Sequence, residues 1–355
     1  MGAGTGIEWT DATWNPIGGC SIHSPGCIHC YAQKLAGTRL KRHPLYAGTT
    51  KLVKGKPVFN GVLTAADDDA AVWRWPLSWR GAKQPVMGAG KPSLIFVGDM
   101  SDLFHEDRPD EVIDRVFAIM ALCPQHIFQV LTKRADRLRR YLLDPHTCNR
   151  IYGLVCDLTL DGFAKVVLMA PTSDEELAPP GRRIYLDKWP LPNVWIGVSV
   201  ENQSYADERI PLLLDTPAAV RFLSCEPLLG PIDFSESSWA AQPKLDWIIA
   251  GGESGHDARP MNPQWARWLR NQCADAGVSF FFKQWGEWRH KGPKPSETPG
   301  RFALAPREFD GPIVEVDHYP RQFASFGSTV LERIGKKEAG RNLDGVEHIN
   351  FPRQP

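Results

Sequence analysis

The sequence of 355 residues lacks net charge, because its 41 Lys and Arg residues balance its 41 Asp and Glu residues. This absence excludes a global positive field, so any affinity for nucleic acid must come from a local patch. The sequence also lacks a run of about 18 apolar residues, and it lacks a basic N-terminal region followed by an apolar stretch. We therefore expect a cytoplasmic protein with no membrane span and no secretory signal.

The composition is typical of a soluble globular protein of the size of an enzyme. Hydrophobic residues make up 43% of the chain, and 13 Trp and 16 Phe residues can build a large core. Five of the eight cysteines are scattered beside apolar residues, as buried small side chains usually are. The other three, Cys20, Cys27 and Cys30, share one short loop. In a reducing compartment, three clustered thiols indicate a metal site rather than a disulfide framework.

Short apolar, β-rich runs alternate along the chain with stretches of helical periodicity. The predicted strands lie within 7–10, 93–102, 126–134, 194–202, 220–228, 246–255 and 278–288. Strands that are apolar on both faces and alternate with helices indicate a parallel sheet with helical cover. We therefore predict an α/β fold, a partial (β/α) TIM-type barrel of about six to seven parallel strands over residues 1–288. A polar insertion is expected at about 149–192, and a C-terminal extension that packs on the barrel at 289–355.

Polar side chains gather at the carboxyl end of each predicted strand after the first. They are Asp99, Ser101 and Asp102; Thr132, Lys133 and Arg134; Ser199, Glu201 and Asn202; Ser224, Cys225 and Glu226; Glu253 and Ser254; and Lys283 and Gln284. For a single strand, polar residues at its end are explained by contact with solvent. Six strands in succession favour a shared pocket, because the carboxyl ends form the active-site face of such a barrel. Internal salt bridges among the charged residues are the alternative.

The three-cysteine loop, GGCSIHSPGCIHCYAQK at 18–34, fits two kinds of metal site. Zinc would need a fourth ligand, and His23 or His29 could complete a Cys₃His tetrahedron. An iron-sulfur cluster of the 4Fe-4S type held by three thiolates would leave one iron open to a substrate or cofactor. Because the loop follows the first predicted strand, we expect it at the same face of the barrel as the polar strand ends.

Two resemblances refine these expectations. A three-cysteine loop followed by further β and α units resembles the radical S-adenosylmethionine superfamily. More closely, the runs WNPIGGC, PGCIHCYA, IFVGDMSDLFHE, FQVLTKR, RFLSCEPLLGPID, DWIIAGGESG and GKKEAGRNLDGVEH are similar to a phage-associated family of unknown function, named after phage proteins gp-thirty-seven and gp-sixty-eight. The superfamily resemblance implies that Cys20, Cys27 and Cys30 ligate three irons and S-adenosylmethionine chelates the fourth. Reductive cleavage would release a 5′-deoxyadenosyl radical, which abstracts hydrogen from a substrate.

The same resemblance implies roles for the strand-end residues. The candidate cofactor-binding residues are Asp99, Ser101, Asp102, Ser199, Glu201, Glu226, Gly251, Gly252 and Glu253. Asp99 or Ser101 is assigned to the methionyl amine, and the acids are expected on that amine and the ribose hydroxyls. Lys133 or Lys283 would bind the cofactor carboxylate or an anionic substrate. His105 is the candidate catalytic acid or base.

Two basic segments, 39–43 and 133–142, could follow a phosphate backbone, although a solvated helix face is the ordinary explanation for the second. The leading hypothesis is a radical enzyme of the bacterial host cytoplasm that modifies or repairs nucleic acid or a nucleoside and takes electrons from a donor. The alternative is a non-catalytic, zinc-stabilised phage protein that binds nucleic acid or assists assembly. Under either hypothesis, the protein could require a partner protein encoded nearby.

Overall fold

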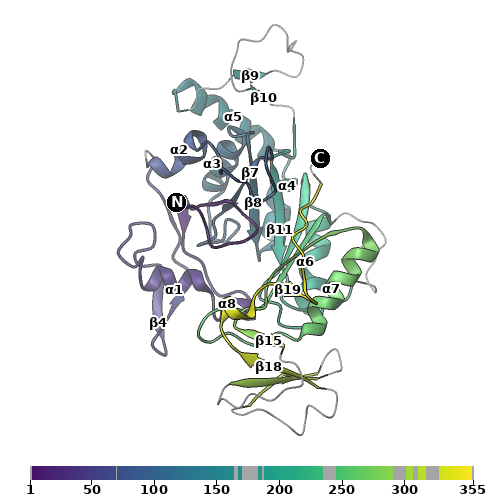
Figure 1. Cartoon of the computed structure of the whole chain (residues 1–355). Helices are drawn as coiled ribbons and strands as arrows, with labels where there is room; N and C mark the ends of the chain where they lie inside the picture. The colour runs from purple at the N-terminus through teal and green to yellow at the C-terminus, as the bar shows by residue number, and fades with distance from the viewer. Residues whose placement is uncertain are drawn as a thin grey trace.

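The structure, a computed structural model, describes residues 2–68, 70–163, 167–169, 183–185, 188–234, 245–290, 301–306, 311–316 and 328–353. Figure 1 shows a curved sheet flanked by helices, with a smaller sheet set apart near the end of the chain. Residues 170–182, which belong to the expected polar insertion, lie outside the described part.

The central sheet has the strand order β1-β2-β7-β8-β11-β12-β13-β14. The strands are β1 Gly2–Ala3, β2 Ala12–Trp14, β7 Ser93–Val97, β8 His126–Thr132, β11 Val194–Ser199, β12 Val220–Cys225, β13 Trp247–Gly251 and β14 Ser279–Gln284. All neighbours from β2 to β14 pair in parallel, whereas β1 runs antiparallel to β2 at one edge. This curled sheet of seven parallel strands confirms the predicted partial barrel.

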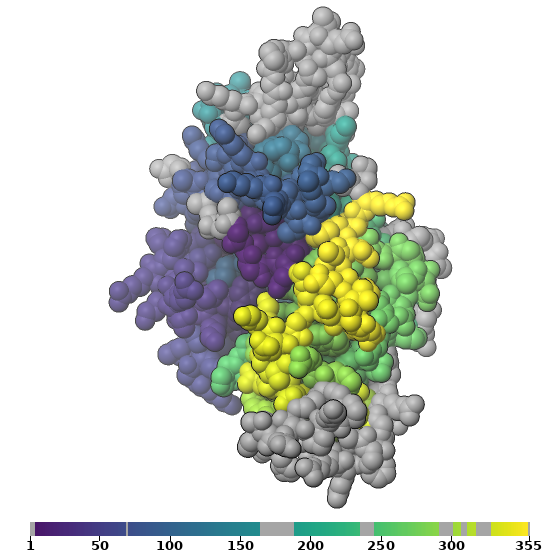
Figure 2. Space-filling model, in the orientation of Figure 1, coloured from purple at the N-terminus to yellow at the C-terminus, as the bar shows by residue number. Residues whose placement is uncertain are grey.

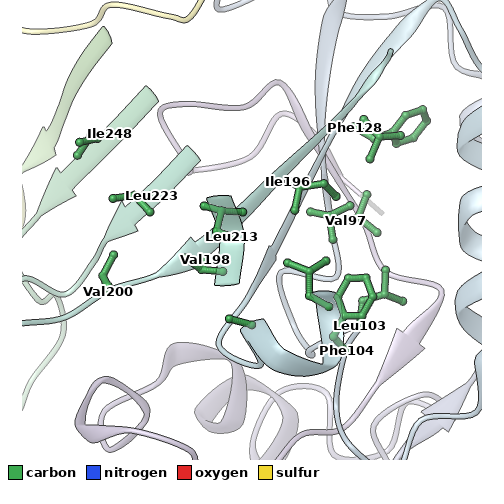
Figure 3. Close-up of a cluster of buried hydrophobic side chains, with 14 of the residues drawn as sticks. Val97, Leu103, Phe104, Phe128, Ile196, Val198, Val200, Leu213, Leu223 and Ile248 are labelled. Atoms are coloured by element: carbon green, nitrogen blue, oxygen red, sulfur yellow. The ribbon is translucent and has the colours of Figure 1, made fainter. Parts of the chain in front are cut away.

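Helices connect these strands and cover one face of the sheet. They are α2 Ala71–Ser78, α3 Asp110–Ala121, α4 Ala135–Leu143, α5 Thr147–Leu160, α6 Gln203–Leu214 and α7 Pro263–Ala276. Alternate residues of a strand point to the same face of a sheet. Val97, Ile196 and Leu223, from β7, β11 and β12, point to the face that the helices cover and pack in one buried cluster with helix residues. Figure 3 shows them in the buried cluster with Leu213 of α6. The main core therefore lies between the sheet and its helical cover.

The opposite face of the sheet carries an aromatic cluster. Its strand residues include Phe96, Trp195, Phe222, Trp247 and Phe281. The Trp9 ring packs on them, with its centroid 4.8 Å from that of Phe96 and 6.2 Å from that of Trp247. The first strand, predicted near 7–10, lies slightly later in the chain, because residues 8–9 form a turn and β2 begins at Ala12. The apolar side chains of that stretch fill the concave face of the sheet instead of extending a strand.

A lateral excursion separates β2 from β7. It contains β3 Ile17–Gly18, the short 3₁₀ helix η1 Pro25–Cys27, α1 Tyr31–Gly37, the hairpin β4 Thr50–Val53 with β5 Lys56–Phe59, and β6 Thr64–Ala65. Strand β3 pairs with β6, which returns the chain to the barrel. Figure 1 shows α1 and β4 projecting to one side of the central sheet.

The region expected as a polar insertion begins within α5, whose Ile151 and Val155 are fully buried. The short strands β9 Val167–Met169 and β10 Arg183–Tyr185 pair in parallel beyond it. No helix in the described ranges is long and apolar enough to cross a membrane.

The C-terminal part forms an antiparallel sheet of order β15-β18-β16-β17. Its strands are β15 Trp288–His290, β16 Phe302–Ala305, β17 Val314–Val316 and β18 Thr329–Arg333, followed by α8 Lys336–Ala339, β19 Asn342–Leu343 and β20 Val346–Glu347. The chain then returns to the barrel, where Trp247 Nε1 donates to the Asn350 carbonyl at 2.8 Å and the Phe351 ring packs on Trp247. Figure 2 shows this segment lying against the N-terminal residues.

Candidate functional site

A cavity of about 250 Å³ opens at the carboxyl ends of the parallel strands. Twelve of the fifteen candidate residues line it: Cys20, Cys27, Cys30, Asp99, Ser101, Asp102, Lys133, Ser199, Glu226, Gly252, Glu253 and Lys283. They come from the cysteine loop and from the ends of β7, β8, β11, β12, β13 and β14. The barrel topology thus brings together residues up to 263 positions apart in the chain, from Cys20 to Lys283.

Residues 18–30 of the three-cysteine loop, called the cysteine loop from here on, are the part of the lateral excursion that contacts the barrel. Gly19 bridges to Ser101 beyond β7, and the Cys20 carbonyl accepts from the amide of Gly61 at 3.1 Å. Gly19 has φ +81°, and a Cβ there would lie 2.0 Å from the Val62 carbonyl oxygen. Only glycine allows this backbone conformation and this close approach. The first thiol is thereby held at the cavity wall.

Arg134 is a buried cation beside the first cysteine. Its Nη1 lies 3.7 Å from Cys20 Sγ and 2.9 Å from Asp102 Oδ2, and its Nη2 donates to Ser21 Oγ at 2.9 Å. Burial alone would raise the pKa of Asp102, but Arg134, Thr132 and two backbone amides lower it overall. Asp102 therefore stays ionised and balances a guanidinium that points at the sulfur.

A second carboxylate, Glu201, fixes the middle of the cysteine loop. It is fully buried and accepts hydrogen bonds from Ser24, Lys133 and Arg209. Burial opposes its ionisation, but Lys133 and Arg209 hold its pKa below the usual value. A Cβ on Gly26 would come within 2.5 Å of Glu201 Oε1, so the loop packs directly on this group.

A third carboxylate, Glu253, holds the far end of the loop. Arg259 donates to it through Nη2 at 2.6 Å and Nε at 2.8 Å, and His29 Nδ1 lies 3.1 Å from Oε2. Arg259 Nη2 also donates to the Pro25 carbonyl at 3.1 Å. Burial would raise the pKa of Glu253, but the hydrogen bonds from Arg259 and His29 lower it. Asp102, Glu201 and Glu253 thus form the internal salt bridges that were the alternative for the strand-end acids.

Other polar groups of the cavity have few protein partners. Ser101 Oγ is buried and has no hydrogen-bond partner among the described residues. Lys283 Nζ lies 3.4 Å from Glu226 Oε1, which is longer than a charge-assisted hydrogen bond. Asp99 accepts from Asn15 Nδ2 at 2.6 Å and from the Tyr31 hydroxyl at 3.1 Å, and burial raises its pKa. Ser101 and Lys283 are the least engaged of these groups and are available to a polar ligand.

Three candidate residues do not line the cavity. His105 is 3% exposed, and its Nε2 lies 2.8 Å from Ser21 Oγ, behind the cysteine loop. Glu201 is covered by its three partners. Gly251 ends β13, where a Cβ would lie 2.6 Å from Glu226 Oε1. His105 and Glu201 position the loop, and Gly251 leaves room for Glu226.

The donor set of the loop suits a soft, thiolate-bound metal centre. All eight cysteines are free, and the three that line the cavity offer sulfur ligands. Burial raises the pKa of Cys20 to about 12 and also raises that of Cys30, so a metal would have to displace their protons. Within the described ranges, no three His, Cys, Asp or Glu side chains are already gathered closely enough to hold a metal ion. For zinc, His23 does not line the cavity, and Nδ1 of His29 is engaged by Glu253.

One family model matches residues 4–352 of the chain. The chain belongs to the family described as protein of unknown function (DUF5131). This confirms the expectation of a family without an assigned activity that spans nearly the whole chain. No curated protein and no solved structure matches it. The match of this DUF5131 protein includes the cysteine loop and every strand end that contributes to the cavity.

Three residues that help to hold the cysteine loop of this DUF5131 protein were not predicted from the sequence. Ser24 and Arg209 bind Glu201, and Arg259 binds Glu253. The one available signal was the number of acids at apolar strand ends, since buried acids need cationic partners. Which cations they take depends on the three-dimensional arrangement.

The basic segment 133–142 of this DUF5131 protein is neutralised. Its five cations pair with acids: Lys133 with Glu201, Arg134 with Asp102, Arg137 with Asp110, Arg139 with Asp215 and Arg140 with Asp136. Ion pairing with these acids is therefore a better explanation of this segment than a phosphate-binding surface.

Proposed function

We propose that this DUF5131 protein is a radical S-adenosylmethionine enzyme with a 4Fe-4S cluster. The observation that carries the proposal is that Cys20, Cys27 and Cys30 line the same cavity as the uncommitted polar groups of the strand ends. Three thiolates with no fourth protein sulfur suit a cluster that leaves one iron to a small ligand. When bound, the cluster would supply one electron, taken from an external donor, to cleave the sulfonium of S-adenosylmethionine into methionine and a 5′-deoxyadenosyl radical.

The protein's own residues would hold and tune this centre. Arg134 places a positive charge 3.7 Å from Cys20 Sγ, which offsets part of the rise in the pKa of this thiol that burial and Asp102 cause. Glu201 and Glu253 hold the loop at Ser24 and His29, which lie close to Cys27 and Cys30 in the sequence. These contacts would support the loop when its three thiols gather around the cluster.

The cofactor would lie along the groups that have few protein partners. Asp99 or Ser101 would accept hydrogen bonds from the methionyl amine, since both line the cavity beside the cysteine loop. Lys283 is the better candidate for the cofactor carboxylate, because Lys133 is engaged by buried Glu201. Glu226 would accept from the ribose hydroxyls. The apolar part of the lining, including Phe96 and Leu131, would limit access of water.

The metal content tests this proposal. Protein purified without oxygen and reconstituted with iron and sulfide is expected to be brown and to hold about four irons per chain. The variant with Cys20→Ala, Cys27→Ala and Cys30→Ala should lose the iron and the colour. The matched control, Cys148→Ala with Cys156→Ala, removes two partly exposed thiols elsewhere and should keep both. Colourless protein with one zinc per chain bound by the same three cysteines would instead support a zinc-stabilised binding protein.

A further inference from the structure

Positive charge is concentrated in residues 34–60, which we call the basic lobe. The lobe holds seven Lys and Arg residues and no Asp or Glu, although the whole chain has equal numbers of each. It comprises most of α1, the segment after it and the β4–β5 hairpin. All seven cations are exposed. The lobe is therefore a local patch of the kind that a chain without net charge needs to bind a polyanion.

Most of these cations have no acidic partner among the residues that the structure describes. Lys56 Nζ pairs with Asp257 Oδ2 at 2.6 Å. The other six form no ion pair within the part of the chain that the structure describes; they are Lys34, Arg39, Lys41, Arg42, Lys51 and Lys54. This differs from segment 133–142, where every cation is neutralised by an acid. The lobe keeps its positive potential at the surface.

The tip of the hairpin places a lysine in an unfavourable backbone conformation. Lys54 and Gly55 form a two-residue turn with φ +48° and +75°, and Lys54 is one of two non-glycine residues with positive φ in the described chain. Such turns favour Asn-Gly, so lysine costs stability at the first position. Leu52 beside it is 74% exposed. The hairpin thus presents a cation and an apolar side chain, which together suit a phosphate backbone and its bases.

The lobe is attached directly to the cavity. Helix α1 begins at Tyr31, immediately after Cys30, and the last residue of the hairpin, Phe59, lines the cavity. Gln33 joins these parts, since its Nε2 donates to the Cys27 carbonyl at 3.0 Å and its Oε1 accepts from the Phe59 amide at 3.3 Å. A chain bound along the lobe would therefore run toward the cavity mouth.

We propose that the basic lobe binds the sugar-phosphate backbone of single-stranded nucleic acid. Delivery of one nucleotide from that strand into the cavity, and the preference for a single strand that follows from it, rest on the proposed function. A single strand is favoured over a duplex because a base must leave its stack before it can enter a cavity of about 250 Å³. The phosphate contacts make binding dependent on salt and largely independent of sequence.

Fluorescence anisotropy with a short labelled single-stranded oligonucleotide tests the proposal. The variant Lys41→Gln, Arg42→Gln and Lys54→Gln removes three unpaired cations of the lobe. We expect at least tenfold weaker binding, and a plot of log affinity against log salt that is less steep by about 2, or about 0.7 for each lost phosphate contact. The matched control is Arg80→Gln, Lys83→Gln and Lys91→Gln. It removes the same charge from exposed positions before β7, at the opposite end of the strands, and should bind like the unaltered protein.

Several results would overturn the inference. It fails if the lobe variant binds as the unaltered protein does, or if the control variant weakens binding equally. It also fails if a duplex binds more tightly than the single strand, or if polyglutamate competes as well as an unlabelled oligonucleotide. The measurement is made with and without the iron-sulfur cluster. If the unaltered protein assembles no cluster and its oligonucleotide binding still depends on the lobe, the proposed function alone is refuted. A cluster-containing protein whose lobe variant binds normally would refute this inference alone.

Discussion

Arg134 is 4% exposed and joins the cysteine loop to the carboxyl ends of the strands. It contacts Asp102, Glu106, Ser21 and Cys20 Sγ. We expect Arg134→Gln to lower the free energy of unfolding by about 3 kcal/mol or more, because Asp102 would be left buried without its cation. Urea unfolding of the metal-free protein measures this loss.

The control for this prediction is Arg140→Gln on α4, which breaks an exposed i,i+4 pair with Asp136 and should change stability by no more than about 0.5 kcal/mol. Arg134→Lys should recover only part of the loss, because an ammonium cannot reproduce the guanidinium contacts with several partners at once. Equal stability of Arg134→Gln and Arg140→Gln would show that the buried network contributes little.

The strand-end acids also make stability depend on pH. Burial opposes the ionisation of Glu253, but Arg259 and His29 lower its pKa below the usual value in the folded protein. A folded pKa below the unfolded one stabilises the protein above pH about 4.3. This stability is lost as the pH falls through the lower folded pKa. We expect Glu253→Gln to show a smaller loss of stability than the unaltered protein between pH about 5 and 3, measured by urea unfolding.

The control substitution for this pH dependence is Asp275→Asn, which changes an exposed carboxylate on α7. It should leave the pH dependence as it is in the unaltered protein. If both variants lose stability over this pH range as steeply as the unaltered protein, Glu253 is not a source of acid sensitivity.

At the scale of elements, the cysteine loop depends on its fit to the end of β11. A Cβ on Gly26 would lie 2.5 Å from Glu201 Oε1, and that carboxylate is held by Ser24, Lys133 and Arg209. We expect Gly26→Ala to lower the free energy of unfolding by about 1–3 kcal/mol, as overpacking does, and to reduce the iron bound after reconstitution. Urea unfolding and iron analysis measure the two effects.

A matched glycine lies on the exposed side of α5. Gly153 has no atom within 4 Å of a built Cβ, so Gly153→Ala should stabilise the protein by about 0.5–1 kcal/mol and leave iron binding unchanged. Normal iron binding by Gly26→Ala would show that the close contact with Glu201 does not fix the thiols.

At the tip of the β4–β5 hairpin, one substitution is expected to raise the stability of the protein and to weaken its binding of an oligonucleotide. Asparagine adopts positive φ more readily than lysine and is favoured before Gly55 in this turn. Lys54→Asn should therefore raise the free energy of unfolding by about 0.5–1 kcal/mol and weaken oligonucleotide binding. If Lys54→Asn is more stable and binds the oligonucleotide as tightly as the unaltered protein does, Lys54 does not contact the bound strand.

Most of the sheet could be predicted from the sequence, because buried parallel strands are apolar on both faces. The segments at 93–102, 126–134 and 194–202 each contain a strand of the central sheet. The first strand was misplaced because Trp9 looks like a strand residue but fills the concave face of the sheet, while β2 uses only Ala12–Trp14. Apolar character shows that a residue is buried, but not which surface covers it.

At the scale of the whole molecule, parallel strands end at one edge, and this rule predicted that distant polar residues would gather around one cavity. The rule could not predict their partners. Arg134 reaches Cys20 across 114 positions, and Ser24 reaches Glu201 across 177. His105 was expected to face the cavity but supports the loop through Ser21. Such pairings depend on where the lateral excursion folds back, which local sequence patterns do not encode.

The distribution of charge also belongs to the whole molecule. The basic segment 133–142 is neutralised by acids from several elements, whereas the basic lobe at 34–60 is not. In the sequence, segment 39–43 of the lobe and segment 133–142 both looked able to follow a phosphate backbone. Only the folded arrangement of acids around each segment distinguishes a structural set of ion pairs from a surface that can bind a polyanion.

The most direct test of the proposed activity is the reductive cleavage of S-adenosylmethionine. Reconstituted protein given a strong one-electron reductant and S-adenosylmethionine should form 5′-deoxyadenosine and methionine, measured by chromatography with mass detection. The Cys148→Ala, Cys156→Ala variant should form them equally, and the Cys20→Ala, Cys27→Ala, Cys30→Ala variant should form none. If the unaltered protein binds its full iron but forms no more 5′-deoxyadenosine than the triple variant, it is not a radical S-adenosylmethionine enzyme.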